Sequence, residues 1–242
     1  HTKFIDMALE LGGKDPAYAR YDCDLDKTVE NLVDGSFFNS GQSCCGIERI
    51  YVDEKIYDNF LEKFISLSYN YKLGNPLEKE NNLGPVVKLS AAEFIVNQME
   101  KAVSKGAKKM IDENKFKFPK EHKNYLVPQV LTNVNHEMDF MTEETFGPCV
   151  GIMKVKNEDE AVSLMNDSPY GLTASIWTND IEVAERIGNQ VQTGTFFMNR
   201  CDYLDPALSW TGVKETGKGC SLSEIAYEKL TSPKSFHLRK KQ

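Results

Sequence analysis

The sequence lacks any apolar run that approaches the roughly 20 residues a membrane-spanning helix needs. It also lacks the apolar core of a signal peptide near its N-terminus. These two absences favour a cytoplasmic protein or a protein of an organelle matrix. Basic residues are outnumbered, with 29 Lys and Arg against 36 Asp and Glu, which gives a net charge of −7. Because nucleic acids and anionic membranes attract a concentrated basic surface, we expect neither as a partner.

Histidine is scarce, and its distribution argues against a metal site. The four histidines have no metal-ligand spacing, so we expect no bound metal. The six cysteines lie in a chain that is neither small nor marked for secretion, and we therefore expect free thiols rather than disulfides. A Gly-x-Gly-x-x-Gly fingerprint is also missing, since Gly217-x-Gly219 is not followed by a third glycine. The chain by itself carries no recognisable dinucleotide-binding loop.

The hydrophobic pattern predicts strands that alternate with helices in one domain over residues 1–233. Asp24 is expected to cap the first helix. Alternation of this kind predicts an α/β fold, with a mainly parallel sheet that carries helices on both faces. The expected strands cover residues 7–11, 47–52, 109–111, 125–131, 149–155 and 173–177, and the expected helices cover 25–37, 56–69, 90–106, 158–165 and 181–191.

Two loops rich in small residues carry a carboxylate and a thiol. Glu10 lies in the segment Leu-Glu-Leu-Gly-Gly-Lys of residues 9–14, and Cys44 ends the segment Asn-Ser-Gly-Gln-Ser-Cys of residues 39–44. A thiolate can attack a carbonyl group, and a nearby carboxylate can then deprotonate the water that releases the acyl group. The two loops together predict covalent catalysis.

Each of these two residues has a simpler interpretation. We expect Cys44 at a junction between a loop and a helix, where the helix N-terminus lowers the pKa of the thiol. Most cysteines are instead buried and structural. We expect the apolar neighbours Leu9 and Leu11 to desolvate Glu10 in part and to raise its pKa. Most glutamates are instead solvated at the surface.

Two further blocks give the sequence a family resemblance. Glu-Glu-Thr-Phe-Gly-Pro occupies residues 143–148, and Trp-Thr-Gly-Val-Lys-Glu-Thr-Gly-Lys-Gly occupies residues 210–219. With the Glu10 and Cys44 segments, these blocks resemble the catalytic domain of the NAD(P)-dependent aldehyde dehydrogenase superfamily. The four blocks follow the family order over nearly the whole chain. The resemblance implies an aldehyde substrate and NAD or NADP as the cofactor.

The resemblance also implies a role for individual residues. Cys44, which follows Gly-Gln-x, would be the nucleophile, and Glu10 would be the general base. Glu144 would hold the nicotinamide ribose through its charged oxygens, and Phe146 would pack against the nicotinamide ring. The remaining predicted residues line the substrate pocket beside the nucleophile or along the aldehyde entry tunnel: Trp210, Leu204, Tyr203, Ser43, Cys45 and Asn199.

Several of these residues have an ordinary structural alternative. Glu144 and Phe146 can be a surface acid and a core aromatic, and Trp210 can be simple packing. Asn199 can be a local structural hydrogen bonder. The C-terminal segment 234–242 begins with a strand-like alternation over 234–239. In the family, a strand at this place joins the sheet of a neighbouring subunit, so the resemblance predicts a homo-oligomer.

In the family, the cofactor-binding domain lies mainly on the N-terminal side of the Glu10 motif, which this chain reaches almost at once. We therefore expect a portion of a longer aldehyde dehydrogenase that lacks most of that domain and is nearly inactive in oxidation alone. Two other functions stay open. One is a cysteine-dependent esterase that needs no nicotinamide, and the other is a non-catalytic scaffold or assembly module.

Overall fold

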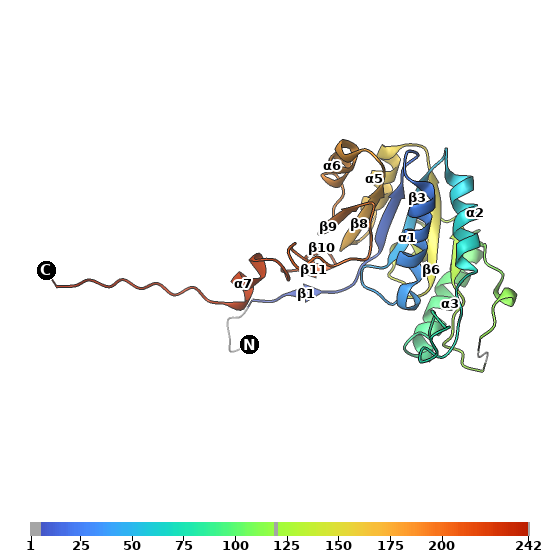
Figure 1. The fold of residues 1–242 in the computed structure, drawn as a ribbon, viewed down its shortest axis with the longest axis horizontal. Helices are drawn as coiled ribbons and strands as arrows, with labels where there is room; N and C mark the ends of the chain where they lie inside the picture. Colours follow the sequence, from blue (N-terminus) through green and yellow to red (C-terminus); the bar gives the residue numbers. More distant parts are fainter. Residues whose placement is uncertain (1–5, 119–120, 242) are drawn as a thin grey trace.

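The computed structural model describes residues 6–118 and 121–241. It places most of them in an α/β body, from which the C-terminal residues extend as a long tail (Figure 1). A central sheet has the strand order β4-β5-β6-β3-β2-β8-β9. All neighbouring strands in it are parallel except the edge pair β4 and β5. The strands are β2 (Asp15–Ala19), β3 (Ile47–Asp53), β4 (Lys108–Lys109), β5 (Gln129–Thr132), β6 (Cys149–Val155), β8 (Thr173–Trp177) and β9 (Thr195–Met198).

Helices cover both faces of this sheet, which confirms the predicted fold class. Ala17 and Ala19 of β2 face a core with α1 and α2, whereas Tyr18 between them faces a core with α5 and α6. This alternation follows from the period of two in a strand. The helices are α1 (Leu25–Phe37), α2 (Tyr57–Ser68), α3 (Leu89–Ser104), α4 (Asp139–Thr142), α5 (Glu158–Asn166), α6 (Ile181–Gly188) and α7 (Ile225–Leu230), with short 3₁₀ helices η1 (Phe38–Gly41) and η2 (Glu113–Lys115).

Two small antiparallel ribbons lie where the body meets the tail (Figure 1). In one of them β1 (Leu9–Glu10) pairs with β11 (Gly217–Lys218), and in the other β10 (Val213–Lys214) pairs with β7 (Tyr170–Gly171). The first ribbon joins the N-terminal and C-terminal parts of the described chain. It therefore brings the Glu10 motif beside the block of residues 210–219.

Most predicted elements agree with the structure, but the prediction was wrong at the start of the chain. The short apolar strand predicted over residues 7–11 is reduced to β1, which is only Leu9–Glu10, and both of its residues are exposed. The buried central strand is instead β2, which the prediction missed. Its short segment Asp-Pro-Ala-Tyr-Ala has no strong apolar run. Its burial comes from its place between β3 and β8.

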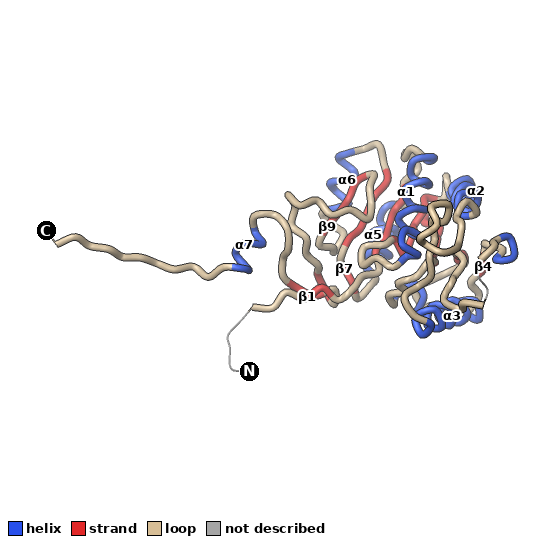
Figure 2. Tube along the Cα trace, turned by 60° about the horizontal axis from the view of Figure 1, so that its bottom comes forward, coloured by secondary structure: helices blue, strands red, loops and turns tan. Residues whose placement is uncertain are grey.

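The observed bounds of some other elements differ from the predicted bounds by a few residues. The strand expected at 109–111 is Lys108–Lys109, the one expected at 125–131 is Gln129–Thr132, and β9 was not predicted. Asp24 caps α1 as predicted, by accepting a hydrogen bond from Lys27 N. Residues 232–241 are extended and exposed, and within the described chain they pair with no strand (Figure 2). The described helices include none whose length and apolar character suit a membrane span.

Candidate active site

Three loops that each precede a sheet strand meet at one edge of the sheet. Residues 10–14 lead into β2, residues 42–46 into β3 and residues 143–148 into β6. These strands are adjacent and parallel, with Asp15 beside Ile47 and Arg49 beside Gly151, so their amino ends lie together. Three of the four sequence blocks thus converge through strand register, although residues 10 and 148 are far apart in the sequence.

The loop of the predicted nucleophile is in direct contact with the other two. A Cβ atom placed on Gly13 would lie 2.8 Å from the Cys44 carbonyl oxygen, so this approach requires a glycine. Gly41 has φ +68°, and a Cβ atom there would overlap the carbonyl oxygen of Gly147. The glycines of these motifs allow the three backbones to approach one another closely.

Cys44 lies in a turn between η1 and β3, and its side chain is half-buried. The expected junction with a following helix is therefore wrong, and no helix N-terminus explains the state of this thiol. The pKa of Cys44 is nevertheless lowered, chiefly by a hydrogen bond with the Cys45 side chain. Burial and the nearby Glu10 carboxylate act in the opposite direction. A thiol with a lowered pKa that solvent can reach is suited to nucleophilic attack.

Cys45 is buried, and it forms a small cluster with Ser43 and Asp202. Its Sγ lies 2.8 Å from Asp202 Oδ1, and Ser43 Oγ donates to the same oxygen over 3.0 Å. Cys45 also packs with Leu172 and Trp210, and Cys44 borders that apolar cluster. Ser43, Cys45 and Trp210, which the sequence assigned to the substrate pocket, thus lie around the Cys44 thiol.

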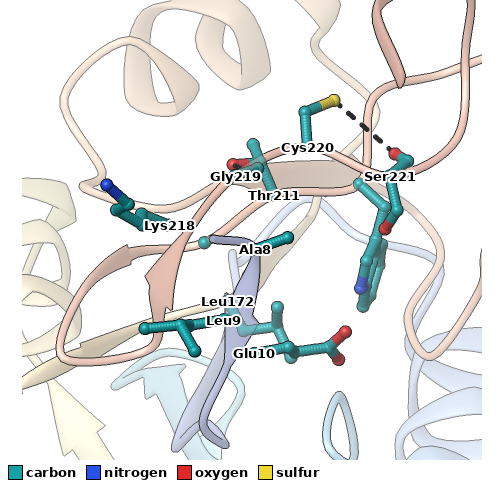
Figure 3. A pocket seen from close by; sticks show the side chains of 11 residues that line it. Ala8, Leu9, Glu10, Leu172, Thr211, Lys218, Gly219, Cys220 and Ser221 are labelled. Atoms are coloured by element: carbon teal, nitrogen blue, oxygen red, sulfur yellow. Dashed lines mark hydrogen bonds between the residues drawn. The ribbon is translucent and has the colours of Figure 1, made fainter. Parts of the chain in front are cut away.

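Glu10 projects from β1 into a pocket of about 180 Å³ that Trp210 also lines. Figure 3 shows its side chain on the opposite side of the strand from Leu9. Glu10 and Cys44 adjoin the same two side chains, because Leu172 and Trp210 line the pocket of Glu10 and also belong to the cluster that Cys44 borders. The carboxylate acts to raise the pKa of the Cys44 thiol. The predicted desolvation was wrong, because Glu10 is exposed and Leu11 is itself 59% exposed. An exposed base beside the thiol has direct access to water.

The Glu144 side chain is held over the loop of residues 10–14. Its Oε1 accepts a hydrogen bond of 3.0 Å from Gly13 N. Among the described residues, no hydrogen bond occupies Oε2. Burial raises the pKa of this carboxyl group, and the Gly13 N–H opposes that shift. Phe146 has φ 55° and leaves 40% of its side chain exposed. The two residues line one open groove, together with Gln42, Val87, Lys88, Ser90, Ala91, Phe94, Glu143, Thr145 and Tyr170.

A buried ion pair lies beneath these loops. Lys14 Nζ donates to Glu48 Oε2 over 2.5 Å and to Thr145 Oγ1 over 2.8 Å. Glu48 Oε1 in turn accepts a hydrogen bond of 2.8 Å from Phe146 N. Arg49 Nε donates to the Lys14 carbonyl oxygen over 2.8 Å. The first residues of β3 therefore connect the loop that carries Glu10 to the loop that carries Glu144.

The remaining predicted residues are less closely associated with Cys44. Tyr203 and Leu204 are 37% and 48% exposed, in the loop that follows Asp202, and the Arg200 guanidinium stacks on the Tyr203 ring. Asn199 binds the Thr178 backbone at both ends of its amide, through Thr178 N at 3.0 Å and Thr178 O at 2.8 Å. These bonds agree with the interpretation of Asn199 as a local structural hydrogen bonder rather than as a residue that lines the substrate pocket.

The sequence analysis missed Asp202, Glu48 and Lys14. Lys14 ends the quoted motif of residues 9–14 without having been given a role, Asp202 precedes the predicted pocket residue Tyr203, and Glu48 follows the nucleophile loop by a few positions. No spacing rule marks them, because their partners lie in other loops. The available signal for Glu48 was an acidic residue followed directly by Arg49 within a strand whose seven residues are all buried.

The α/β fold of this chain has counterparts among solved structures. Betaine aldehyde dehydrogenase from Staphylococcus aureus in complex with NAD+ aligns with a TM-score of 0.84 and 31% identity, over 90% of this chain and 44% of that one. Lactaldehyde dehydrogenase from Escherichia coli aligns with a TM-score of 0.83 and 33% identity, over 90% of this chain and 45% of that one.

Sequence comparison gives the same result. Residues 1–236 match the aldehyde dehydrogenase family, and the chain belongs to this family. Aldehyde dehydrogenase 1A1 of Oryctolagus cuniculus is 34% identical over 234 residues, and 3-sulfolactaldehyde dehydrogenase of Priestia megaterium is 33% identical over 226 residues. These alignments cover 96% and 93% of this chain but 46% of either relative. The chain thus spans about half the length of the curated relatives it matches.

Proposed function

We propose that this chain is the catalytic portion of an enzyme that oxidises an aldehyde to a carboxylic acid, with Cys44 as nucleophile and Glu10 as general base. The observation that carries the proposal is that Glu10 and Cys44 border the same apolar side chains, Leu172 and Trp210, in a site built by three family motifs. Glu10 is exposed and Cys44 is half-buried in a turn, so solvent and a small substrate can reach both side chains.

In the first step the Cys44 thiolate adds to the aldehyde carbon to form a thiohemiacetal. The Cys44 backbone N–H helps to lower the pKa of the Cys44 thiol, and a donor this near to the reacting sulfur is suited to bind the oxyanion. Trp210 and Leu172 pack beside Cys45 and offer an apolar surface to the organic part of the aldehyde. The half-buried position limits the access of bulk water to the sulfur.

The groove beside Glu144 suits a nicotinamide cofactor, NAD or NADP. The free oxygen of Glu144 can accept hydrogen bonds from ribose hydroxyls, and the exposed face of Phe146 can pack against a flat ring. Held by Glu144 and Phe146, a nicotinamide would supply the hydride acceptor that oxidation of the aldehyde carbon on Cys44 requires. The solved relative from Staphylococcus aureus is a complex with NAD+, which supports this class of cofactor.

In the second step Glu10 accepts a proton from water, and the water attacks the thioester on Cys44. The exposure of Glu10 is consistent with this role, because the base must reach solvent and the acyl sulfur in turn. The acid then leaves and the Cys44 thiolate is restored.

The test is an assay of the full-length natural protein for aldehyde-dependent formation of reduced nicotinamide, which absorbs light where the oxidised form does not. Cys44→Ser is expected to abolish turnover, whereas Cys23→Ser is the matched control and is expected to retain it. Turnover by Cys44→Ser would overturn the proposal. Ester cleavage that needs Cys44 and ignores added cofactor would favour the esterase. A Cys44 no more reactive than Cys23 or Cys220 toward iodoacetamide would favour the scaffold.

We further propose that the protein forms a homo-oligomer and acts in the cytoplasm or an organelle matrix. Support for the oligomer comes from the tail, where Phe236 and Leu238 are 73% and 87% exposed on an extended backbone with free edges. Sedimentation of the protein with and without residues 234–242 tests this proposal. A change from oligomer to monomer on removal is the expected result.

A further inference from the structure

Gln42, two residues before Cys44, uses both ends of its side-chain amide to bind backbone groups. Its Oε1 accepts a hydrogen bond of 2.8 Å from Val87 N. Its Nε2 donates to Asn39 O over 3.0 Å and to Pro85 O over 3.4 Å. One side chain therefore connects the loop of the proposed nucleophile to the segment that precedes α3.

Two further side chains bind this segment, residues 84–88. Ser40 Oγ, which belongs to the nucleophile loop, donates to Gly84 O over 2.7 Å. Asn124 pairs with Val86, since its Nδ2 donates to Val86 O over 3.0 Å and its carbonyl oxygen accepts from Val86 N over 2.9 Å. The segment is thus bound to the nucleophile loop on both sides of Val86.

The same segment and the first turns of α3 line the groove proposed for the cofactor. Val87 and Lys88 come from the segment, and Glu144 and Phe146 belong to the third loop of the site. Val87 is 79% exposed, so packing does not hold it in place. Lys88, the N-cap residue of α3, has no side-chain cap hydrogen bond. In the described part of the chain, Gln42 Oε1 is the one acceptor of the Val87 N–H.

We propose that Gln42 is a positioning residue for the cofactor groove: its amide fixes residues 85–87 against the loop that carries Cys44, so that this wall is formed before a nicotinamide nucleotide binds. A wall already in place avoids the free-energy cost of ordering it on binding. The inference rests on the proposed use of this groove by a cofactor. Glutamine suits the task because its amide offers a carbonyl oxygen to Val87 N and two N–H donors to carbonyl groups.

Hydrogen–deuterium exchange at the Val87 N–H measures the contact directly on the full-length natural protein. Gln42→Met has a similar length but lacks the amide, and exchange is expected to become about fivefold faster or more. Gln42→Glu keeps an acceptor, and its Val87 N–H is expected to stay protected. The Val86 N–H, which donates to Asn124 O, is the internal control and should exchange at the same rate in wild type and both variants.

Cofactor binding gives the second measurement, by calorimetric titration with NAD. Gln42→Met is expected to raise the dissociation constant by about threefold to tenfold, because the loosened wall must be ordered on binding. The KM for NAD should rise with it, whereas the KM for the aldehyde should stay within about twofold, since the apolar surface of Leu172 and Trp210 is unchanged. Gln42→Glu should bind NAD more tightly than Gln42→Met. A role in stability alone would not separate the two KM values.

Gln190→Met is the matched control, because the Gln190 amide donates to Arg186 O near the end of α6 and does not line the groove. It should leave the Val87 exchange and the NAD affinity unchanged. An unchanged Val87 exchange in Gln42→Met, or an unchanged NAD affinity despite faster exchange, would overturn the proposal. Turnover by Cys44→Ser would overturn the proposed catalysis and leave both measurements valid, so the two failures are distinguishable.

Discussion

The Lys14 ammonium group lies 2.5 Å from the Glu48 carboxylate, and the two side chains are 0% and 6% exposed. Lys14 belongs to the loop of residues 10–14, and Glu48 is the second residue of β3, the strand that follows Cys44. Through Thr145 and Phe146, the pair also holds the loop of Glu144. One buried ion pair thus connects all three loops of the proposed site.

Removal of one partner of this pair is expected to destabilise the protein severely. Lys14→Met leaves the Glu48 carboxylate buried without its counter-charge, and Glu48→Gln leaves the Lys14 ammonium in the same state. Each loss is expected to cost about 3–5 kcal/mol in the free energy of unfolding, measured by urea titration. Lys63→Met, which breaks the exposed pair with Asp26, is the control and should change little.

The double variant Lys14→Met/Glu48→Gln tests whether the cost of each single variant comes from the unpaired charge that it leaves buried. Its glutamine still offers a carbonyl oxygen to Phe146 N, and no unpaired charge remains buried. We therefore expect it to be more stable than either single variant. Additive losses in the double variant would show that the contribution comes from packing rather than from the pairing of charges.

Glu10→Gln is expected to separate acylation from deacylation. Cys44 keeps its thiol, so the first turnover proceeds, but no carboxylate accepts the proton of the attacking water. Steady-state turnover should fall by about 10²–10⁴-fold while a burst of about one reduced nicotinamide per site remains. Rapid-mixing absorbance measures both phases. If the burst and the steady rate fell together, Glu10 would be needed for thiol attack as well.

Glu144→Gln is expected to weaken cofactor binding while the loop stays in place. The glutamine oxygen still accepts from Gly13 N, whereas the charged acceptor for ribose hydroxyls is lost. Because burial raises the pKa of Glu144, wild-type affinity should fall as the pH drops through that raised value. Calorimetric titration with NAD at several pH values checks this, and the variant should show no such fall.

The buried carboxyl group of Asp15 is expected to make the stability of the protein depend on pH. Burial raises the pKa of this carboxyl group well above its ordinary value of 3.8, against the opposing hydrogen bonds from Thr173. The folded state then binds more protons than the unfolded state, so stability falls as the pH rises from about 4 through the folded pKa. Asp15→Asn mimics the protonated form, because its amide can donate to Thr173 Oγ1 and accept from Thr173 N.

The Asp15→Asn protein is therefore expected to unfold at a higher temperature than wild type at neutral pH. The difference should vanish at low pH, where the wild-type carboxyl group is protonated. Thermal unfolding followed by circular dichroism across this pH range gives the measurement. A variant less stable than wild type at every pH would show that the Asp15 carboxylate is stabilised, not strained, by its site.

Helical periodicity and apolar runs predicted most of the sheet and its helices from the sequence. Residues 25–37 and 173–177 have clear patterns, and the structure has elements with the same bounds. Strand β2 was missed, since Asp15, Pro16 and two alanines carry little intrinsic signal for a strand. Only pairing with β3 on one side and β8 on the other makes that segment the centre of the sheet.

The sequence by itself determined the family motifs, the α/β class and the identity of the thiol and carboxylate proposed for catalysis. Tertiary structure alone decided the surroundings of those groups. Glu10 is exposed although its neighbours are apolar, and Asp202 lies beside Cys45 although 157 positions separate them. The physical reason is that both environments come from tertiary contacts: β1 pairs with β11 outside the central sheet, and the loop after β9 passes beside the turn that holds Cys45. The environment of each loop therefore depends on partners that local spacing does not specify.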